Sequence, residues 1–62
     1  MNSSQLDALL NREVEVTFES DGRTEIGFLT KGDYSTYLLS CRDYTIQFTK
    51  GGVKKVKERE EN

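Results

Sequence analysis

The feature that most constrains this fold is a glycine, Gly27, in the middle of a segment with the pattern of a β-strand, residues 23–31. Glycine weakens a strand interior, and it occurs there where the strand bends sharply or where another backbone approaches closely. A bend of this kind lets a small sheet curl toward a barrel. We therefore expect the chain to be organised around residues 27–39. This stretch leaves the bent strand, passes the polar Gly32-Asp33 break and enters another strand.

The segments beside Gly27 alternate between apolar and polar residues, as half-buried strands do. In the segment 13–19 the apolar residues are Val14, Val16 and Phe18. An Asp-Gly pair follows at 21–22, a dipeptide that favours tight hairpin turns because both residues tolerate positive φ. In the segment 23–31 we expect two apolar residues on the core face, Ile26 and Phe28.

Three more strands are predicted, at 37–41, 44–48 and 53–57. The last of them follows a second glycine break, Lys50-Gly51-Gly52, and its two valines, Val53 and Val56, are three residues apart. A regular strand cannot turn both valines inward, so we expect a helical turn or bulge at 50–53. We also expect this break to lie beside the first one, at Gly32-Asp33.

Residues 4–11 are predicted to form a short helix. Ser4 and Asp7 have the spacing of a capping box. The leucines form an apolar stripe at helical spacing, Leu6, Leu9 and Leu10. Two turns of helix are marginal on their own, so we expect this helix to dock as a lid over the core.

The predicted fold is mainly β, in a single domain over residues 1–62. The short N-terminal helix is followed, over about 12–57, by a five-stranded, strongly bent antiparallel small barrel. The acidic tail, 58–62, has nothing to bury, and we expect it to fray. A chain of 62 residues is near the lower limit of what folds alone. Such a domain usually needs a disulfide, a metal or self-association.

The composition narrows these possibilities. With one cysteine, Cys41, and no histidine, the chain has neither an internal disulfide nor a tetrahedral zinc site, which leaves self-association. A lone thiol fits a reducing cytoplasm, and no apolar run approaches the length of a membrane span. With no signal peptide pattern, we expect a cytoplasmic protein without a membrane partner. Because Cys41 has no base to activate it and no glycine loop opens a helix, we expect no enzyme and no cofactor.

Charge is unevenly distributed along the chain. Residues 1–30 hold two basic and six acidic residues, a net charge of −4, whereas residues 31–57 hold six basic and two acidic residues, a net charge of +4. The basic half suits an anionic ligand or head-to-tail packing of copies. Alternatively, the opposite charges only keep a small domain soluble. The lysines at 54, 55 and 57 are either an electrostatic track or gatekeepers on an exposed strand.

The order and spacing of these features resemble the Sm-like family, which includes the Sm and LSm proteins and bacterial Hfq. The resemblance covers roughly residues 4–57. The family's first motif corresponds to a set of residues that follows the turn Asp21-Gly22-Arg23, namely Gly27, Leu29, Asp33, Leu38 and Leu39. Its second motif, a basic residue and a glycine followed by hydrophobic residues, corresponds to Lys50, Gly51, Val53 and Val56.

The resemblance implies a ring of five to seven identical subunits, in which the fourth strand of one copy pairs with the fifth strand of the next. It also implies that the two glycine-containing loops line a central pore where single-stranded RNA binds. Asp33 orients its loop, and Lys50 and Gly51 contact the nucleotide. Two positions depart from the family, because Ser35 replaces the stacking residue and Tyr37 replaces the asparagine.

Two tyrosines are the remaining candidates for stacking on a base, Tyr34 and Tyr37, since base–aromatic stacking tolerates any base. The alternative for each is a ring packed against the protein with its hydroxyl at the surface. The predicted function is a homo-oligomeric ring that binds single-stranded RNA, as an RNA chaperone does, through Asp33, Tyr34, Tyr37, Lys50 and Gly51. The alternative is a structural or protein-interaction ring with no nucleic-acid role.

Overall fold

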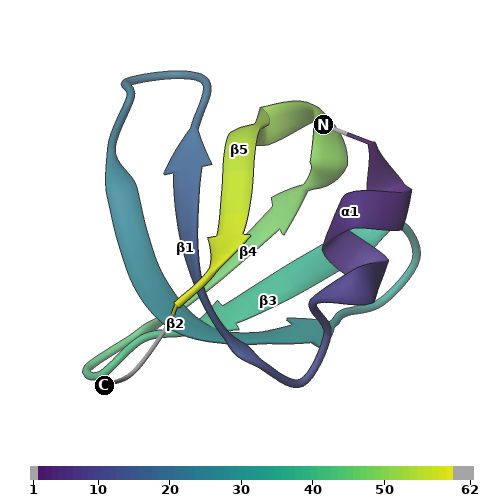
Figure 1. Cartoon of the computed structure of the whole chain (residues 1–62), viewed down its shortest axis with the longest axis horizontal. Coiled ribbons are helices and arrows are strands. Elements are labelled where there is room, and N and C mark those ends of the chain that lie inside the picture. The colour runs from purple at the N-terminus through teal and green to yellow at the C-terminus, as the bar shows by residue number, and fades with distance from the viewer. Residues whose placement is uncertain (1, 60–62) are drawn as a thin grey trace.

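The structure, a computed structural model, describes residues 2–59 (Figure 1). Its elements are α1 (Ser3–Ala8), β1 (Glu13–Phe18), β2 (Thr24–Lys31), β3 (Thr36–Ser40), β4 (Thr45–Thr49), the 3₁₀ turn η1 (Lys50–Gly52) and β5 (Val53–Glu58). The predicted short helix and five antiparallel strands are confirmed, with boundaries that differ by no more than three residues. No helix in residues 2–59 has the length and apolarity needed to span a membrane.

The strands form one antiparallel sheet in the order β4-β3-β2-β1-β5. β2 is shared between two neighbours, because residues 24–28 pair with β1 and residues 28–31 pair with β3. This long strand curves across the molecule in Figure 1 and carries the sheet from one side of the core to the other. The sheet does not close, since β4 and β5 remain its two edges. The predicted small barrel is therefore not confirmed by a single chain.

Gly27 lies where the backbones of β2 and β3 approach closely. A Cβ atom at this position would be 2.6 Å from the carbonyl oxygen of Ser40 and 2.9 Å from its carbonyl carbon. Real side chains do not tolerate such distances, so only glycine fits here without moving β3. One of the two predicted uses of this glycine, close backbone approach, is confirmed.

The prediction that Ile26 and Phe28 face the core is wrong. They are 40% and 44% exposed, whereas Leu29 is fully buried. Side chains along a strand alternate between its two faces. Gly27 is buried, so Leu29 lies on the same, buried face, whereas Ile26 and Phe28 lie on the exposed face. On the buried face the Ser40 backbone leaves no space for a side chain at position 27, so glycine is the residue that fits there.

The core is filled from every strand and from α1. Its buried hydrophobic residues are Leu6, Val14, Val16, Leu29, Tyr37, Leu39, Phe48 and Val53. In β4, Phe48 is buried and Ile46 is half-buried against this core. The expected turn before the last strand is also confirmed. η1 and an irregular register opposite Thr17 and Phe18 let Val53 be buried while Val56 packs against the core.

The helix begins earlier than predicted and is capped differently. Asn2 is the N-cap, and its side-chain oxygen accepts a hydrogen bond of 2.8 Å from the N–H of Ser4. The predicted capping box between Ser4 and Asp7 is therefore wrong, because asparagine already fills the capping role. Leu6 still docks α1 on the sheet with no exposed surface, so the predicted lid is confirmed.

The end of the last strand also lies farther along than predicted. Glu58 belongs to β5, and its carboxylate accepts from Arg12 at 2.9 Å. The N–H of Arg59 donates to the carbonyl of Glu13 at 3.0 Å. Residues 58 and 59 are thus held against β1, and the remainder of the expected frayed tail, 60–62, lies outside the described residues.

Candidate nucleic-acid interface

The two glycine breaks lie side by side, as the sequence predicted. Thr36 at the start of β3 pairs with Thr49 at the end of β4, so the segments 32–35 and 50–52 leave the sheet at the same end. Together with α1 they form a pocket of about 180 Å³, lined by Ser3, Asp7, Lys31, Tyr34, Ser35, Tyr37 and Lys50. Three of the five predicted site residues, Tyr34, Tyr37 and Lys50, thus meet at one place.

Tyr34 stands at the tip of the 32–35 segment. It is 96% exposed, and its φ of 58° lies in the left-handed region. A residue with a Cβ is uncommon in that region and costs roughly 1–2 kcal/mol there. The chain therefore holds a large aromatic ring in solvent on strained backbone, and the ring is free for stacking.

Tyr37 has the opposite environment. It is 2% exposed, and its ring stacks on Phe48 with centroids 6.0 Å apart and an interplanar angle of 24°. The ammonium of Lys31 lies 5.0 Å from the Tyr37 ring centroid. Of the two roles that the sequence left open, this conformation is the packed ring. Tyr37 lines the pocket, and its hydroxyl reaches Asp7, which lines the pocket too.

That hydroxyl leads to a residue that the sequence did not predict, Asp7 of α1. The Tyr37 hydroxyl donates to Asp7 Oδ1 at 2.7 Å, and Lys31 Nζ lies 3.4 Å from the same oxygen. The hydrogen bond from Tyr37 is the main cause that lowers the pKa of Asp7, and Lys31 acts in the same direction. Asp7 in turn raises the pKa of Lys31. The pKa of Tyr37 is raised by burial first and by Asp7 second.

The other two predicted residues flank the pocket without lining it. Asp33 is exposed, and its backbone carbonyl accepts a hydrogen bond of 3.1 Å from the N–H of Thr36. The loop is therefore closed through the Asp33 backbone, and no hydrogen bond or ion pair of its carboxylate is found within residues 2–59. Gly51 is exposed in η1, and a Cβ there would meet nothing closer than 4.0 Å.

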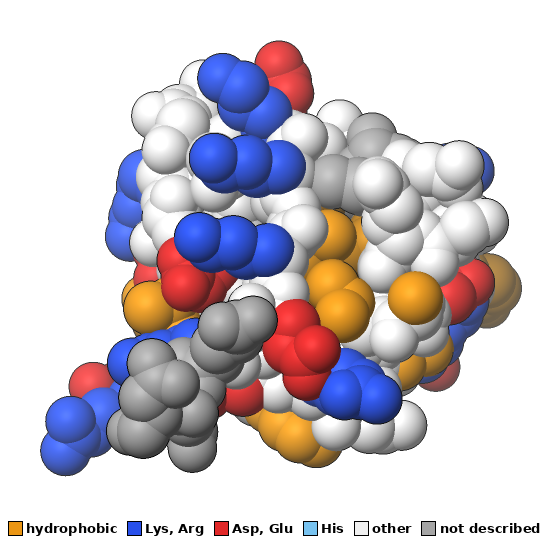
Figure 2. Space-filling view, viewed as in Figure 1, with side chains coloured by type: hydrophobic (Ala, Val, Ile, Leu, Met, Phe, Trp, Pro, Cys, Tyr) orange, Lys and Arg blue, Asp and Glu red, His pale blue; other side chains and the backbone are white. Residues whose placement is uncertain are grey.

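Basic side chains extend from this end of the sheet along β5. Lys54, Lys55 and Lys57 are exposed, and in Figure 2 the Lys and Arg side chains form a row over the face where β5 lies in Figure 1. Lys50 stands just before this strand. Among residues 2–59, no ion pair involves any of these four lysines. Their charges are thus not neutralised by carboxylates of the same described chain.

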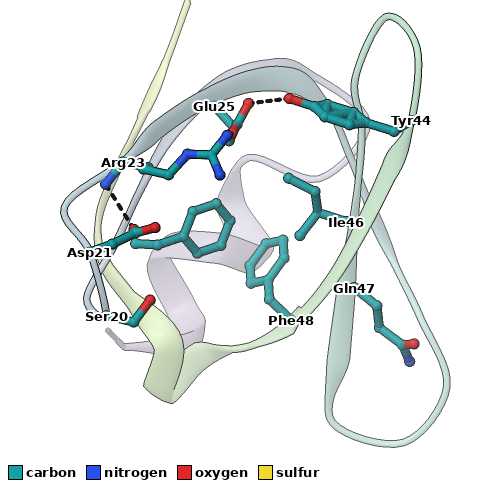
Figure 3. Close-up of a pocket in the computed structure, with 9 residues that line it drawn as sticks. Ser20, Asp21, Arg23, Glu25, Tyr44, Ile46, Gln47 and Phe48 are labelled. Carbon is teal, nitrogen blue, oxygen red and sulfur yellow. Dashed lines mark hydrogen bonds and ion pairs between the residues drawn. The ribbon is translucent and has the colours of Figure 1, made fainter.

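A second hollow, of about 390 Å³, opens beside the edge strand β4 (Figure 3). Its apolar lining comes from Phe18, Ile46 and Phe48, and the rings of Phe18 and Phe48 meet edge to face at 5.4 Å. On the rim, Glu25 accepts from the Tyr44 hydroxyl at 2.5 Å and pairs with Arg23 at 2.6 Å. The hydrogen bond to Glu25 is the main cause that raises the pKa of Tyr44.

A third groove lies on the opposite face of β2, where Ile26 and Phe28 are exposed. Cys41 and Arg42 line it as well. Burial is the main cause that raises the pKa of the Cys41 thiol. The thiol is therefore kept in its neutral, less reactive form.

No metal centre is formed within residues 2–59, because no three His, Cys, Asp or Glu side chains gather closely enough to hold an ion. No protein-family model, curated protein or solved structure matches the chain. The residues of the pocket are therefore the basis for assigning a function.

Proposed function

We propose that this chain is a divergent member of the Sm-like family whose copies form a ring that binds single-stranded RNA. The observation that carries the proposal is the meeting of Tyr34, Tyr37, Lys31 and Lys50 in one pocket at the end of β3 and β4. An exposed aromatic ring beside two ammonium groups suits a nucleotide, which offers a base to stack and a phosphate to pair. The proposed role is binding without catalysis.

Each residue has a proposed task in this site. Tyr34 stacks on a base and contributes about 1–3 kcal/mol per base without selecting its identity. Lys50 contacts a phosphate, and the open surface at Gly51 lets the RNA backbone approach η1. Asp33 keeps the loop closed through its backbone. Tyr37 contributes its hydroxyl, while its packed ring fixes the position of the pocket wall.

The ring is supported by what the sheet leaves unpaired. β4 and β5 are the two edges, and exposed edges present unpaired N–H and C=O groups that attract another strand. We propose that β4 of one copy pairs with β5 of the next, in a ring of five to seven subunits. The neighbour then covers the apolar hollow of Phe18, Ile46 and Phe48 beside β4. In this assembly the bent sheet corresponds to the small barrel of the family, open between β4 and β5.

Light scattering tests the assembly, and an oligonucleotide titration tests the binding. A ring gives a mass that is a multiple of 7.1 kDa, whereas a mass of one chain at micromolar concentration contradicts the ring. Oligo-U and oligo-A should bind with affinity that falls steeply with salt, as phosphate contacts require.

Lys50→Ala should weaken that binding and reduce the salt slope by about 0.7 for each phosphate that the lysine no longer pairs. Arg42→Ala is the matched control. It removes one exposed cation from the turn between β3 and β4, at the end of β3 opposite to the pocket. If the wild type binds neither oligonucleotide at low ionic strength, the RNA-binding proposal is wrong.

The second candidate is a ring that binds protein and has no nucleic-acid role. It is favoured by the groove of about 480 Å³ with exposed Ile26 and Phe28, since large exposed apolar side chains often mark protein contacts. The net charge of −2 is also unfavourable for RNA. This candidate predicts a stable oligomer whose thermal stability does not change when RNA is added.

A further inference from the structure

Asp7 places a carboxylate inside the pocket where the proposed function requires a phosphate. Its Oδ1 takes both the Tyr37 hydroxyl, at 2.7 Å, and the Lys31 ammonium, at 3.4 Å. Both are groups that donate to anions, and the ammonium of Lys50 is a further such donor that lines the same pocket. A carboxylate oxygen and a phosphate oxygen accept hydrogen bonds from the same donors.

We propose that Asp7 is an internal competitor of RNA, which occupies the anion position of the pocket until a phosphate displaces it. The inference rests on the proposed RNA-binding function and deepens it by naming the regulation of that site. In the unliganded chain, Asp7 neutralises Lys31 and keeps the Tyr37 hydroxyl engaged. When RNA binds, its phosphate takes over these two donors and the Asp7 carboxylate turns to solvent.

The contact is built so that it can be displaced. The side chains of Lys31 and Asp7 are 50% and 46% exposed, so the carboxylate reaches water without any backbone opening. An ion pair with this exposure is weak, because solvent screens it. Leu6 stays buried while Asp7 lies on the exposed surface of the same helix, so α1 remains docked when the carboxylate leaves. The exchange therefore needs only a side-chain rotation.

Asp7→Asn is the test, with Asp43→Asn as the matched control. Asparagine keeps an oxygen that accepts from the Tyr37 hydroxyl, but it no longer neutralises Lys31. The control removes the same charge from the turn between β3 and β4, away from the pocket. Circular dichroism and thermal melting establish that each variant folds. Asp7→Ser, which also keeps a short polar side chain, replaces Asp7→Asn if that variant does not fold.

Affinity for oligo-U is measured by fluorescence anisotropy across a salt series. Asp7→Asn should bind about two- to fivefold more tightly for each subunit that the oligonucleotide contacts, the size expected for one exposed charge pair. The gain should grow with oligonucleotide length, because contacts on successive subunits multiply. The salt slope should steepen by about 0.7 for each further phosphate that is paired.

The outcomes separate this inference from the function on which it rests. Tighter binding by Asp7→Asn than by both the wild type and Asp43→Asn supports the inference. Equal gains in Asp7→Asn and Asp43→Asn overturn it, because overall charge then explains the effect. Weaker binding in Asp7→Asn also overturns it, because Asp7 then positions the RNA-binding groups. If all three proteins fail to bind, the RNA-binding function itself is wrong and the inference falls with it.

Discussion

Gly27→Ala should destabilise the fold, because the backbone of β3 lies too close to position 27 to admit a side chain. The new Cβ would lie 2.6 Å from Ser40 O, whereas ordinary contact begins at 3.4 Å, so the backbones of β2 and β3 must part by up to about 0.8 Å. Both atoms in the closest contacts belong to the Ser40 backbone, so no side-chain rotation relieves the clash. Neighbouring hydrogen bonds near 2.9 Å would then stretch beyond the range in which they hold.

Overpacking of this kind costs about 1–3 kcal/mol. A domain of this size has a total stability of only about 3–5 kcal/mol, so the substitution should remove roughly a fifth or more of it. In thermal melts each kcal/mol corresponds to a Tm change of about 4–8 °C. Urea denaturation followed by circular dichroism gives the free energy of unfolding. All proteins are compared at one chain concentration, because self-association makes stability depend on concentration.

Gly52→Ala is the matched control for Gly27→Ala. A Cβ at Gly52 meets nothing within 4 Å, and its φ is not positive. The alanine should therefore leave stability unchanged or raise it by up to about 1 kcal/mol, since it restricts the unfolded chain. Equal urea midpoints for Gly27→Ala and Gly52→Ala would refute the argument that close approach of β3 requires the glycine.

Two further predictions concern the pocket. Tyr34→Asn should keep or raise the Tm, because asparagine tolerates the φ of 58°, while RNA affinity measured by anisotropy falls by about 1–3 kcal/mol per stacked base; unchanged affinity would contradict the stacking role. Tyr37→Phe should change the pH dependence of stability. Because the pKa of Tyr37 is raised in the folded state, the neutral hydroxyl stabilises the fold fully at pH values below 10.0, the usual pKa of tyrosine. This stabilisation is lost as the pH rises above that value. The lowered pKa of Asp7 gives stability that is lost as the pH falls below 3.8. Urea midpoints at acid and alkaline pH should therefore vary less in Tyr37→Phe than in the wild type, and identical pH profiles would show that the Tyr37–Asp7 contact carries no stability.

Local patterns were sufficient to predict the strands and their breaks. The alternation of apolar and polar residues predicted β1. The spacing of Val53 and Val56 predicted the turn η1, because residues three positions apart in a regular strand point to opposite faces. The sequence also predicted that the two glycine breaks lie side by side. Antiparallel pairing of β3 with β4 brings the start of β3 beside the end of β4, where the two breaks are.

Hydrophobicity alone gave the wrong answer for which face of β2 packs on the core. Ile26 and Phe28 are as apolar as Leu29, so the alternation of residues 24–31 fits either face. The position of Gly27 indicates which face is buried. Position 27 is buried against the Ser40 backbone, and residues two positions away share its face of the strand. Gly27 therefore selects Leu29 for the core.

The contact of Asp7 with Lys31 and Tyr37 could not be predicted from local patterns. It joins α1 to residues 24 and 30 positions farther along the chain, and it depends on the angle at which Leu6 docks the helix. Asp7 also had a competing local explanation as part of a capping box. Asn2, which is as good an N-cap residue as Ser4, was the signal in the sequence that the helix has another cap and that Asp7 is available for another role.

Three features of the isolated chain lack a cause within it. The backbone of Tyr34 is strained to hold an exposed ring, the edges β4 and β5 are unpaired beside an apolar hollow, and Gly51 is a glycine although neither space nor φ requires one. Natural chains keep such local costs mainly where function uses them. The proposed RNA-binding ring would give each of them a cause, because a base would cover Tyr34, the next subunit would cover the edges and the RNA backbone would pass over Gly51. A protein-binding ring would explain only the edges, which makes Tyr34 and Gly51 the positions that separate the two functions.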